Sequence, residues 1–84
     1  PGNLSALHLA AEHNAPLIAE ELFKQNPNME AKGGDKGRTP LQVAAAKNNT
    51  DMLRLLLKNG ASVDSRDDDN ATAFDIAQAA KHTE

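Results

Sequence analysis

The side chains with the widest chemical range are the three histidines, His8, His13 and His82. No two of them are four residues apart, which is the spacing that places two imidazoles on one helix face as metal ligands. Only His8 and Glu12 are one helix turn apart, and one such pair falls short of the ligand number of a metal site. The pattern predicts no metal ion and no histidine acting as a general acid or base.

Nucleophiles and phosphate-binding loops are also unsupported. The serines at positions 5, 62 and 65 lie in no nucleophile-elbow sequence. The glycine-rich stretch over residues 33–37 lacks the spacing of a phosphate-binding loop, and it precedes a helix start instead of following a strand. The sequence therefore predicts a chain that is not an enzyme, with no catalytic residue and no cofactor.

An acidic run, Asp67-Asp68-Asp69-Asn70, suggests calcium at first sight. A calcium-binding loop of the helix-loop-helix kind needs oxygen ligands at alternate positions, then a glycine and a distal glutamate, but Ala71 and Thr72 stand where such residues are needed. We expect a solvated acidic turn over Asp67 to Asp69. Weak calcium binding and a basic partner are the alternatives.

Composition narrows the class of protein further. The chain has 84 residues, 39% apolar and only 2% aromatic, with no cysteine. Its core must therefore be aliphatic, without disulfides or cysteine-bound zinc, and a large aromatic-lined ligand pocket is not expected. The net charge of −3 argues against nucleic acid as a partner. No apolar run, the three leucines at residues 55–57 included, is long enough for membrane insertion, and no signal-like segment precedes them.

The sequence repeats itself with a period of 33 to 34 residues. A shift of 34 places Leu7 on Leu41, Ala10 on Ala44, Ala11 on Ala45, Asn14 on Asn48 and Leu22 on Leu56. A shift of 33 then places Thr39 on Thr72, Leu41 on Phe74, Val43 on Ile76 and Ala44 on Ala77. The first unit has one extra residue, which lies between residues 32 and 37.

Each unit contains two helix signals and a loop. Thr39-Pro40-Leu41-Gln42 is typical of a helix start: threonine caps, proline suits the first turn, and Gln42 completes a capping box. Ser5 and Thr72 repeat the cap. A second helix is predicted from Asn49 or Thr50 to Asn59-Gly60, with Leu53, Leu56 and Leu57 as its core stripe. The polar stretch over residues 61–71 predicts an extended loop.

Asparagine and glycine recur where the units turn. These are positions at which a chain needs positive φ, which glycine adopts freely and asparagine tolerates. The predicted sites after the first helices are Asn14 and Asn48, those after the second helices are Asn26 and Gly60, and those before the caps are Asn3, Gly37 and Asn70.

These motifs resemble the ankyrin-repeat family over almost the whole chain. The stretches that carry the resemblance are Ser5-Ala6-Leu7-His8-Leu9-Ala10-Ala11, Gly37-Arg38-Thr39-Pro40-Leu41-Gln42-Val43-Ala44-Ala45, Leu55-Leu56-Leu57-Lys58-Asn59-Gly60-Ala61-Ser62-Val63-Asp64 and Thr72-Ala73-Phe74-Asp75-Ile76-Ala77. Departures from the family pattern are Glu21, Asn26-Pro27, Gln78 and the Gly33-Gly34 insertion.

The resemblance implies an α fold: an ankyrin-repeat solenoid of antiparallel helix pairs joined by β-hairpin-like loops, about two and a half repeats long. It places repeat 1 at residues 1–33, repeat 2 at 34–66 and a truncated repeat 3 at 67–84 of a single domain. His8 is expected to tie neighbouring loops together. Because residues 1–3 and 83–84 fall inside repeat units, we expect the chain to be a fragment of a longer array.

The resemblance also implies a non-catalytic protein-protein interaction module that binds a partner protein or peptide through its hairpin tips and the concave face of its first helices. The alternative is a regulatory or targeting segment of a larger enzyme or channel. The expected location is intracellular, in the cytoplasm or nucleus. Because the second unit is basic, an acidic partner segment is predicted opposite repeat 2. The predicted partner-binding residues are Glu12, His13, Lys32, Asp35, Lys36, Arg38, Ala46, Lys47, Arg66, Asp68, Asp69 and Ala71, with Leu4, Ala79 and Ala80 on the same face.

Overall fold

The fold is given by a computed structural model that describes residues 4–34 and 36–80. Its helices are α1 (Ala6–Glu12), α2 (Pro16–Phe23), α3 (Pro40–Lys47), α4 (Thr50–Lys58) and α5 (Ala73–Ala79). The predicted helix starts are confirmed, because Ser5, Thr39 and Thr72 are the N-caps of α1, α3 and α5. In the described ranges, no helix has the length and apolarity needed to cross a membrane.

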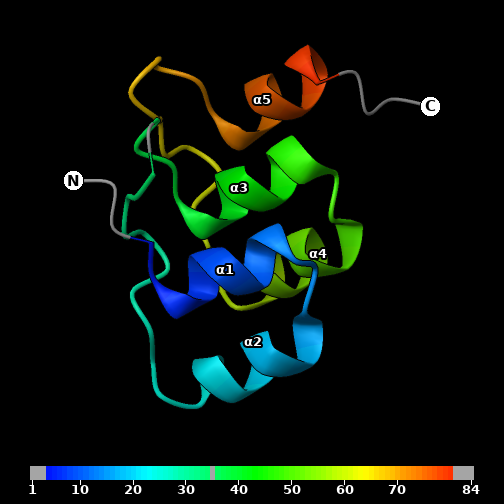
Figure 1. Cartoon of the computed structure of the whole chain (residues 1–84). Helices are drawn as coiled ribbons and strands as arrows, with labels where there is room; N and C mark the ends of the chain where they lie inside the picture. Colours follow the sequence, from blue (N-terminus) through cyan, green and yellow to red (C-terminus); the bar gives the residue numbers. More distant parts are fainter. Residues whose placement is uncertain (1–3, 35, 81–84) are drawn as a thin grey trace.

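The helices form two layers (Figure 1). α3 packs between α1 and α5 in one layer, while α2 and α4 pack together in the other. α1 contacts α2, and α3 contacts α4, so the first two repeats are helix pairs of the same kind. The connecting loops after α2 and α4 return the chain to the start of the next first helix, and they project from the same side of the stack (Figure 1).

The core lies between the two layers and is aliphatic, as the composition predicts. Leu7, Leu41, Met52 and Leu56 are its large side chains, and each is at most 2% exposed. Alanine fills much of the remaining core, and Ala11, Ala19 and Ala44 have no exposed surface. Because a methyl group lets two helix backbones approach closely, short helices can bury enough apolar surface with Phe23 as a partly buried aromatic against the core.

The turns follow the prediction for positive φ. Asn14, Asn26, Asn48 and Asn70 have φ between 51° and 64°, and Gly37 and Gly60 have φ of 60° and 95°. Asn3 lies outside the described residues, as do His82 and the last two residues. The turn after α3 shows the local chemistry: Asn48 is the left-handed C-cap, and its amide donates to carbonyls of the preceding turn.

The predicted leucine stripe of α4 is only partly a core stripe. Leu56 is fully buried and Leu53 is half-buried, but Leu57 is 45% exposed. Phe74 is 68% exposed although its counterparts Leu7 and Leu41 are each 2% exposed. The reason is the helix pairing: α2 covers α1 and α4 covers α3, whereas no second helix covers α5 in the described part of the chain. A hollow of about 250 Å³ remains there, lined in part by Leu53, Leu57 and Phe74.

Candidate functional site

The candidate site is built on the three capped starts of α1, α3 and α5. Each N-cap hydroxyl accepts a hydrogen bond from the backbone amide three residues later, and the side chain of that third residue accepts one from the N-cap amide. The third residue is His8 in repeat 1, Gln42 in repeat 2 and Asp75 in repeat 3. This reciprocal arrangement fixes both the helix start and the rotamer of the third side chain.

In repeats 1 and 2 that third side chain also reaches the following hairpin. His8 Nε2 lies 2.7 Å from the carbonyl oxygen of Arg38. Because His8 Nδ1 accepts from the Ser5 amide at 3.2 Å, we assign the ring proton to Nε2, which donates to that carbonyl. Gln42 Nε2 similarly donates to the carbonyls of Ser65 and Ala71, at 2.6 and 3.3 Å. The expectation that His8 ties neighbouring loops is confirmed.

The hairpins themselves have different lengths. In the first, Gly33 and Arg38 exchange two backbone hydrogen bonds of 3.0 Å around residues 34–37. In the second, the Asp67 amide donates to the Ala71 carbonyl at 3.0 Å around residues 68–70. The first loop is therefore one residue longer, which accounts for the change of period from 34 to 33. The Asp68 amide donates to the Lys36 carbonyl at 2.8 Å and holds the two tips together.

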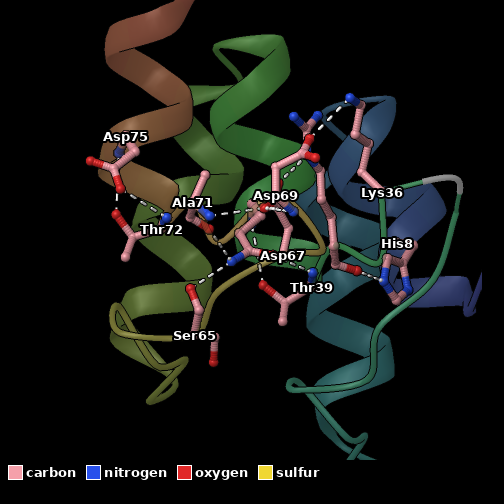
Figure 2. A network of polar contacts seen from close by, with 11 residues as sticks. His8, Lys36, Thr39, Ser65, Asp67, Asp69, Ala71, Thr72 and Asp75 are labelled. Atoms are coloured by element: carbon pink, nitrogen blue, oxygen red, sulfur yellow. Dashed lines mark hydrogen bonds and ion pairs between the residues drawn. The ribbon is translucent and has the colours of Figure 1, made fainter.

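The prediction of a solvated acidic turn is wrong for Asp67. It is only 5% exposed, and Oδ1 accepts from the amides of Asp69 and Ala71, both at 2.9 Å. Oδ2 accepts from Arg38 Nε at 3.2 Å. Figure 2 shows Asp67 beside Asp69 and Ala71. The amides of the turn that point inward need a hydrogen-bond acceptor. The Asp67 carboxylate supplies it and is therefore buried, while Asp68 and Asp69 stay exposed.

The same contacts set the protonation of Asp67. Burial raises the pKa of this carboxyl, but the hydrogen bonds from the Ala71 amide, the Arg38 side chain and the Asp69 amide outweigh burial. The net pKa is lower than the ordinary value of 3.8. Asp67 is therefore an anion at neutral pH and holds Arg38 against the second hairpin.

A second ion pair joins the hairpin tips. Lys36 Nζ lies 3.0 Å from Asp69 Oδ2, and both side chains are more than half exposed. Two of the four cations that make the predicted face basic, Lys36 and Arg38, thus have carboxylate partners within the chain. Arg66 donates to the Asn70 carbonyl at 2.9 Å and remains exposed, as does Lys47 at the end of α3.

The structure brings some of the predicted binding residues together and separates others. Arg38, Ala46, Asp69 and Ala71 line one hollow of about 340 Å³, here called the α3–α5 hollow. The remaining residues that line this hollow are Asp67, Asp75, Ile76, Ala79 and Ala80. The predicted residues outside its lining are Glu12, His13, Lys32, Lys36, Lys47, Arg66 and Asp68. Asp35 lies outside the described residues.

His13 belongs to a different surface, since it lines a hollow with Leu9 and Ile18 on the α1 side of the stack. Asp67 and Asp75 were not among the predicted binding residues, because Asp67 was expected only in a solvated acidic turn and Asp75 only within a stretch that carries the family resemblance. The available signal for Asp75 was its alignment with His8 and Gln42, whose side chains reach beyond their own repeat.

Comparison with known proteins agrees with the repeat architecture. A family model described as ankyrin repeats (3 copies) matches residues 3–84. The chain is 34% identical over 73 residues to glycerophosphocholine phosphodiesterase gde1 of Schizosaccharomyces pombe, which covers 87% of the chain and 6% of that protein. It is 33% identical over 86 residues to protein fem-1 homolog C of Xenopus laevis, covering 88% of the chain and 14% of the relative.

A third relative is human neurogenic locus notch homolog protein 4, which is 36% identical over 74 residues, covering 84% of the chain and 4% of that protein. The chain therefore spans a small part of the length of each of these relatives. The chain belongs to the ankyrin-repeat family.

Proposed function

We propose that this chain is a non-catalytic module that binds a partner protein through its hairpin tips and the exposed side of α1, α3 and α5. The observation that carries the proposal is the α3–α5 hollow, which opens between the second hairpin and two first helices. The helix caps and the Arg38–Asp67 pair hold its walls in place before any partner arrives. Such preorganisation lowers the entropic cost of binding.

The charges on repeat 2 make the proposal more specific. Lys47 and Arg66 are exposed on repeat 2, so an acidic partner segment opposite this repeat remains our proposal. Lys36 and Arg38 add less positive charge to this surface, because Asp69 partly neutralises Lys36 and Asp67 partly neutralises Arg38. The intracellular location, in the cytoplasm or nucleus, is part of the same proposal, and imaging of the tagged parent polypeptide tests it.

The surface is tested by selecting peptides from a phage-displayed random library against the immobilised chain. Ala79 is exposed and lines the α3–α5 hollow, so Ala79→Tyr places a bulky side chain there. Gln25→Tyr adds the same side chain at an exposed position after α2. Selected peptides should bind the Gln25→Tyr variant normally and the Ala79→Tyr variant at least tenfold more weakly. Equal binding to both variants would remove this surface from the proposal.

The acidic segment has its own test. Lys47 and Lys58 are exposed lysines in the last turns of α3 and α4. Charge reversal at Lys47 should weaken binding of the selected peptides and reduce its salt dependence, while charge reversal at Lys58 should not. If the two variants bind alike, the partner carries no acidic segment opposite repeat 2.

A second candidate function is a regulatory or targeting segment within a larger enzyme or channel. One observation favours it: the chain matches only 6% of a glycerophosphocholine phosphodiesterase, so such repeats do occur in polypeptides named as enzymes. In this case the bound segment belongs to the same polypeptide. Backbone amides of Ala71 and Ala79 should then exchange hydrogen more slowly in the parent polypeptide than in the 84-residue chain. Equal exchange rates would favour a separate partner.

A further inference from the structure

The third residues of α1, α3 and α5 differ in whether their side chains can donate a hydrogen bond to the next element of the stack. His8 and Gln42 both donate a hydrogen bond to a carbonyl of the following hairpin. Asp75 occupies the same position in repeat 3, but an ionised carboxylate has no proton to donate and only accepts. One of its lone-pair sites takes the Thr72 amide at 3.2 Å. Whatever lies against the rest of this carboxylate must be a donor.

Asp75 is exposed and forms part of the wall of the α3–α5 hollow. The apolar part of that wall is aliphatic, made by Ile76 and the alanines at positions 46, 71, 79 and 80. Asp69 lies on the hairpin side of the same hollow. In Figure 2, Asp69 and Asp75 lie on separate elements. The hollow thus combines alkyl surface with two exposed carboxylates.

The charges of the lining are unbalanced. Arg38 and Asp67 face each other as a pair and cancel. Asp69 is shared with Lys36, but that pair is exposed on both sides and is therefore screened and weak. Among the described residues that line the hollow, the paired Arg38 is the only cation near Asp75. The open side of the hollow consequently carries negative charge beside apolar surface.

We propose that the α3–α5 hollow binds a lysine or arginine side chain of the partner, with its alkyl stem against the alanines and its charged head at Asp75 and Asp69. A long basic side chain matches both halves of the surface, because its methylene groups can be buried while its head stays at the polar rim. The volume of about 340 Å³ is at the small end for a ligand site and suits a single side chain.

This inference rests on the proposed function and makes it more specific. A partner would then present a basic residue to the start of repeat 3 and acidic residues to Lys47 and Arg66 in repeat 2. Such a pattern would fix the direction in which the partner segment runs across the stack.

The test is a titration of the ¹⁵N-labelled chain with Ac-Ala-Arg-Ala-NH2, followed by amide chemical shifts. The control peptide has citrulline in place of arginine, which keeps the shape of the side chain and removes its charge. We expect saturable shifts at Ala71, Asp75 and Ala79 with the arginine peptide, and at least fivefold weaker binding of the citrulline peptide. Equal binding of the two peptides, or no saturable shift with either, would overturn the proposal.

Two variants locate the charge. In Asp75→Asn the side-chain oxygen can still accept from the Thr72 amide, so the helix cap is kept while the charge is lost. Asp51→Asn is the matched control, because it removes an exposed carboxylate from the first turn of α4. Binding of the arginine peptide should fall at least threefold in Asp75→Asn and stay unchanged in Asp51→Asn. An equal effect of the two variants would contradict the assignment to Asp75.

Failure of this inference can be told apart from failure of the proposed function. If library-selected peptides lose binding to Ala79→Tyr yet carry no basic residue, the binding surface stands and the basic side chain is wrong. If no selected peptide depends on Ala79, the proposed function itself fails. Calcium is checked in the same titration: shifts at Asp69 and Asp75 with calcium chloride alone, together with none from the arginine peptide, would assign the carboxylates to a cation instead.

Discussion

Arg38 donates through Nε to Asp67 Oδ2 at 3.2 Å, and the side chain of Asp67 is only 1% exposed. The two residues belong to successive hairpins, so this pair joins repeat 2 to repeat 3 at the surface proposed for binding. It differs from the exposed Lys36–Asp69 pair because solvent does not screen its carboxylate.

The Arg38–Asp67 contact should matter for stability. Asp67→Ala removes the acceptor of two turn amides and leaves Arg38 without its partner, so the free energy of unfolding should fall by about 2 to 4 kcal/mol. Asp67→Asn keeps an oxygen for the amides and should cost about half as much. Asp69→Ala, at the exposed pair, should cost less than about 1 kcal/mol. Urea unfolding measures all three, and an equal cost at positions 67 and 69 would contradict this account.

Stability should also depend on pH through Asp67. Its pKa in the folded chain is lower than the ordinary 3.8, so its contribution is fully present above that value and is lost as the pH falls through the folded pKa. The difference in unfolding free energy between the wild type and Asp67→Asn should therefore be constant from pH 7 to about pH 5 and shrink below about pH 4. A difference that grows on acidification would show that the sign is wrong.

The two side chains that tie repeats together should be interchangeable. Gln42 accepts from its N-cap amide and donates to the next hairpin, as His8 does. His8→Gln should therefore keep the free energy of unfolding within about 1 kcal/mol of wild type, whereas His8→Leu should lower it by about 2 kcal/mol or more by leaving the Ser5 amide and the Arg38 carbonyl unpaired. Thermal or urea unfolding provides the comparison. Equal destabilisation by both substitutions would mean that His8 acts through packing alone.

Equivalent positions of α3 and α5 should contribute differently to the free energy of unfolding, because α4 covers α3 whereas no second helix covers α5 among the described residues. Leu41 is 2% exposed and Phe74 is 68% exposed at the matching position of repeat 3. Leu41→Ala should cost about 3 kcal/mol of unfolding free energy, while Phe74→Ala should cost less than about 1 kcal/mol despite removing a larger side chain. A cost at Phe74 equal to that at Leu41 would require a cover for α5 that the described residues do not supply.

Features fixed by local chemistry could be predicted from the sequence. A cap such as Thr39 with Gln42 three residues later satisfies the orphan amides of its own helix, so the bounds of α3 follow from the residues within it. The same holds for Asn48 and Gly60, whose positive φ depends on the turn alone. Leu7 and Leu41, which the repeat alignment places at the same position, are both buried, because each helix pair buries its own stripe.

Features that depend on residues far apart in the sequence could not be predicted in this way. The sequence shows Asp67 in an acidic run, but its burial requires Arg38, 29 residues earlier, to lie beside it. The exposure of Leu57 depends on whether a further helix packs on α4 and α5, which the spacing of leucines does not reveal. For the proposed binding surface, some of the predicted residues line the α3–α5 hollow, while the pairing of the charges came only from the geometry.

The most direct test of the central claim is to map one library-selected peptide onto the chain by amide chemical shifts. Binding at the proposed surface predicts saturable shifts at Lys36, Arg38, Lys47, Ala71 and Ala79, with little change in α2 and α4. Shifts confined to α4, Val63 and Phe74 would instead place the peptide on the uncovered apolar hollow between α4 and α5, and would contradict the account.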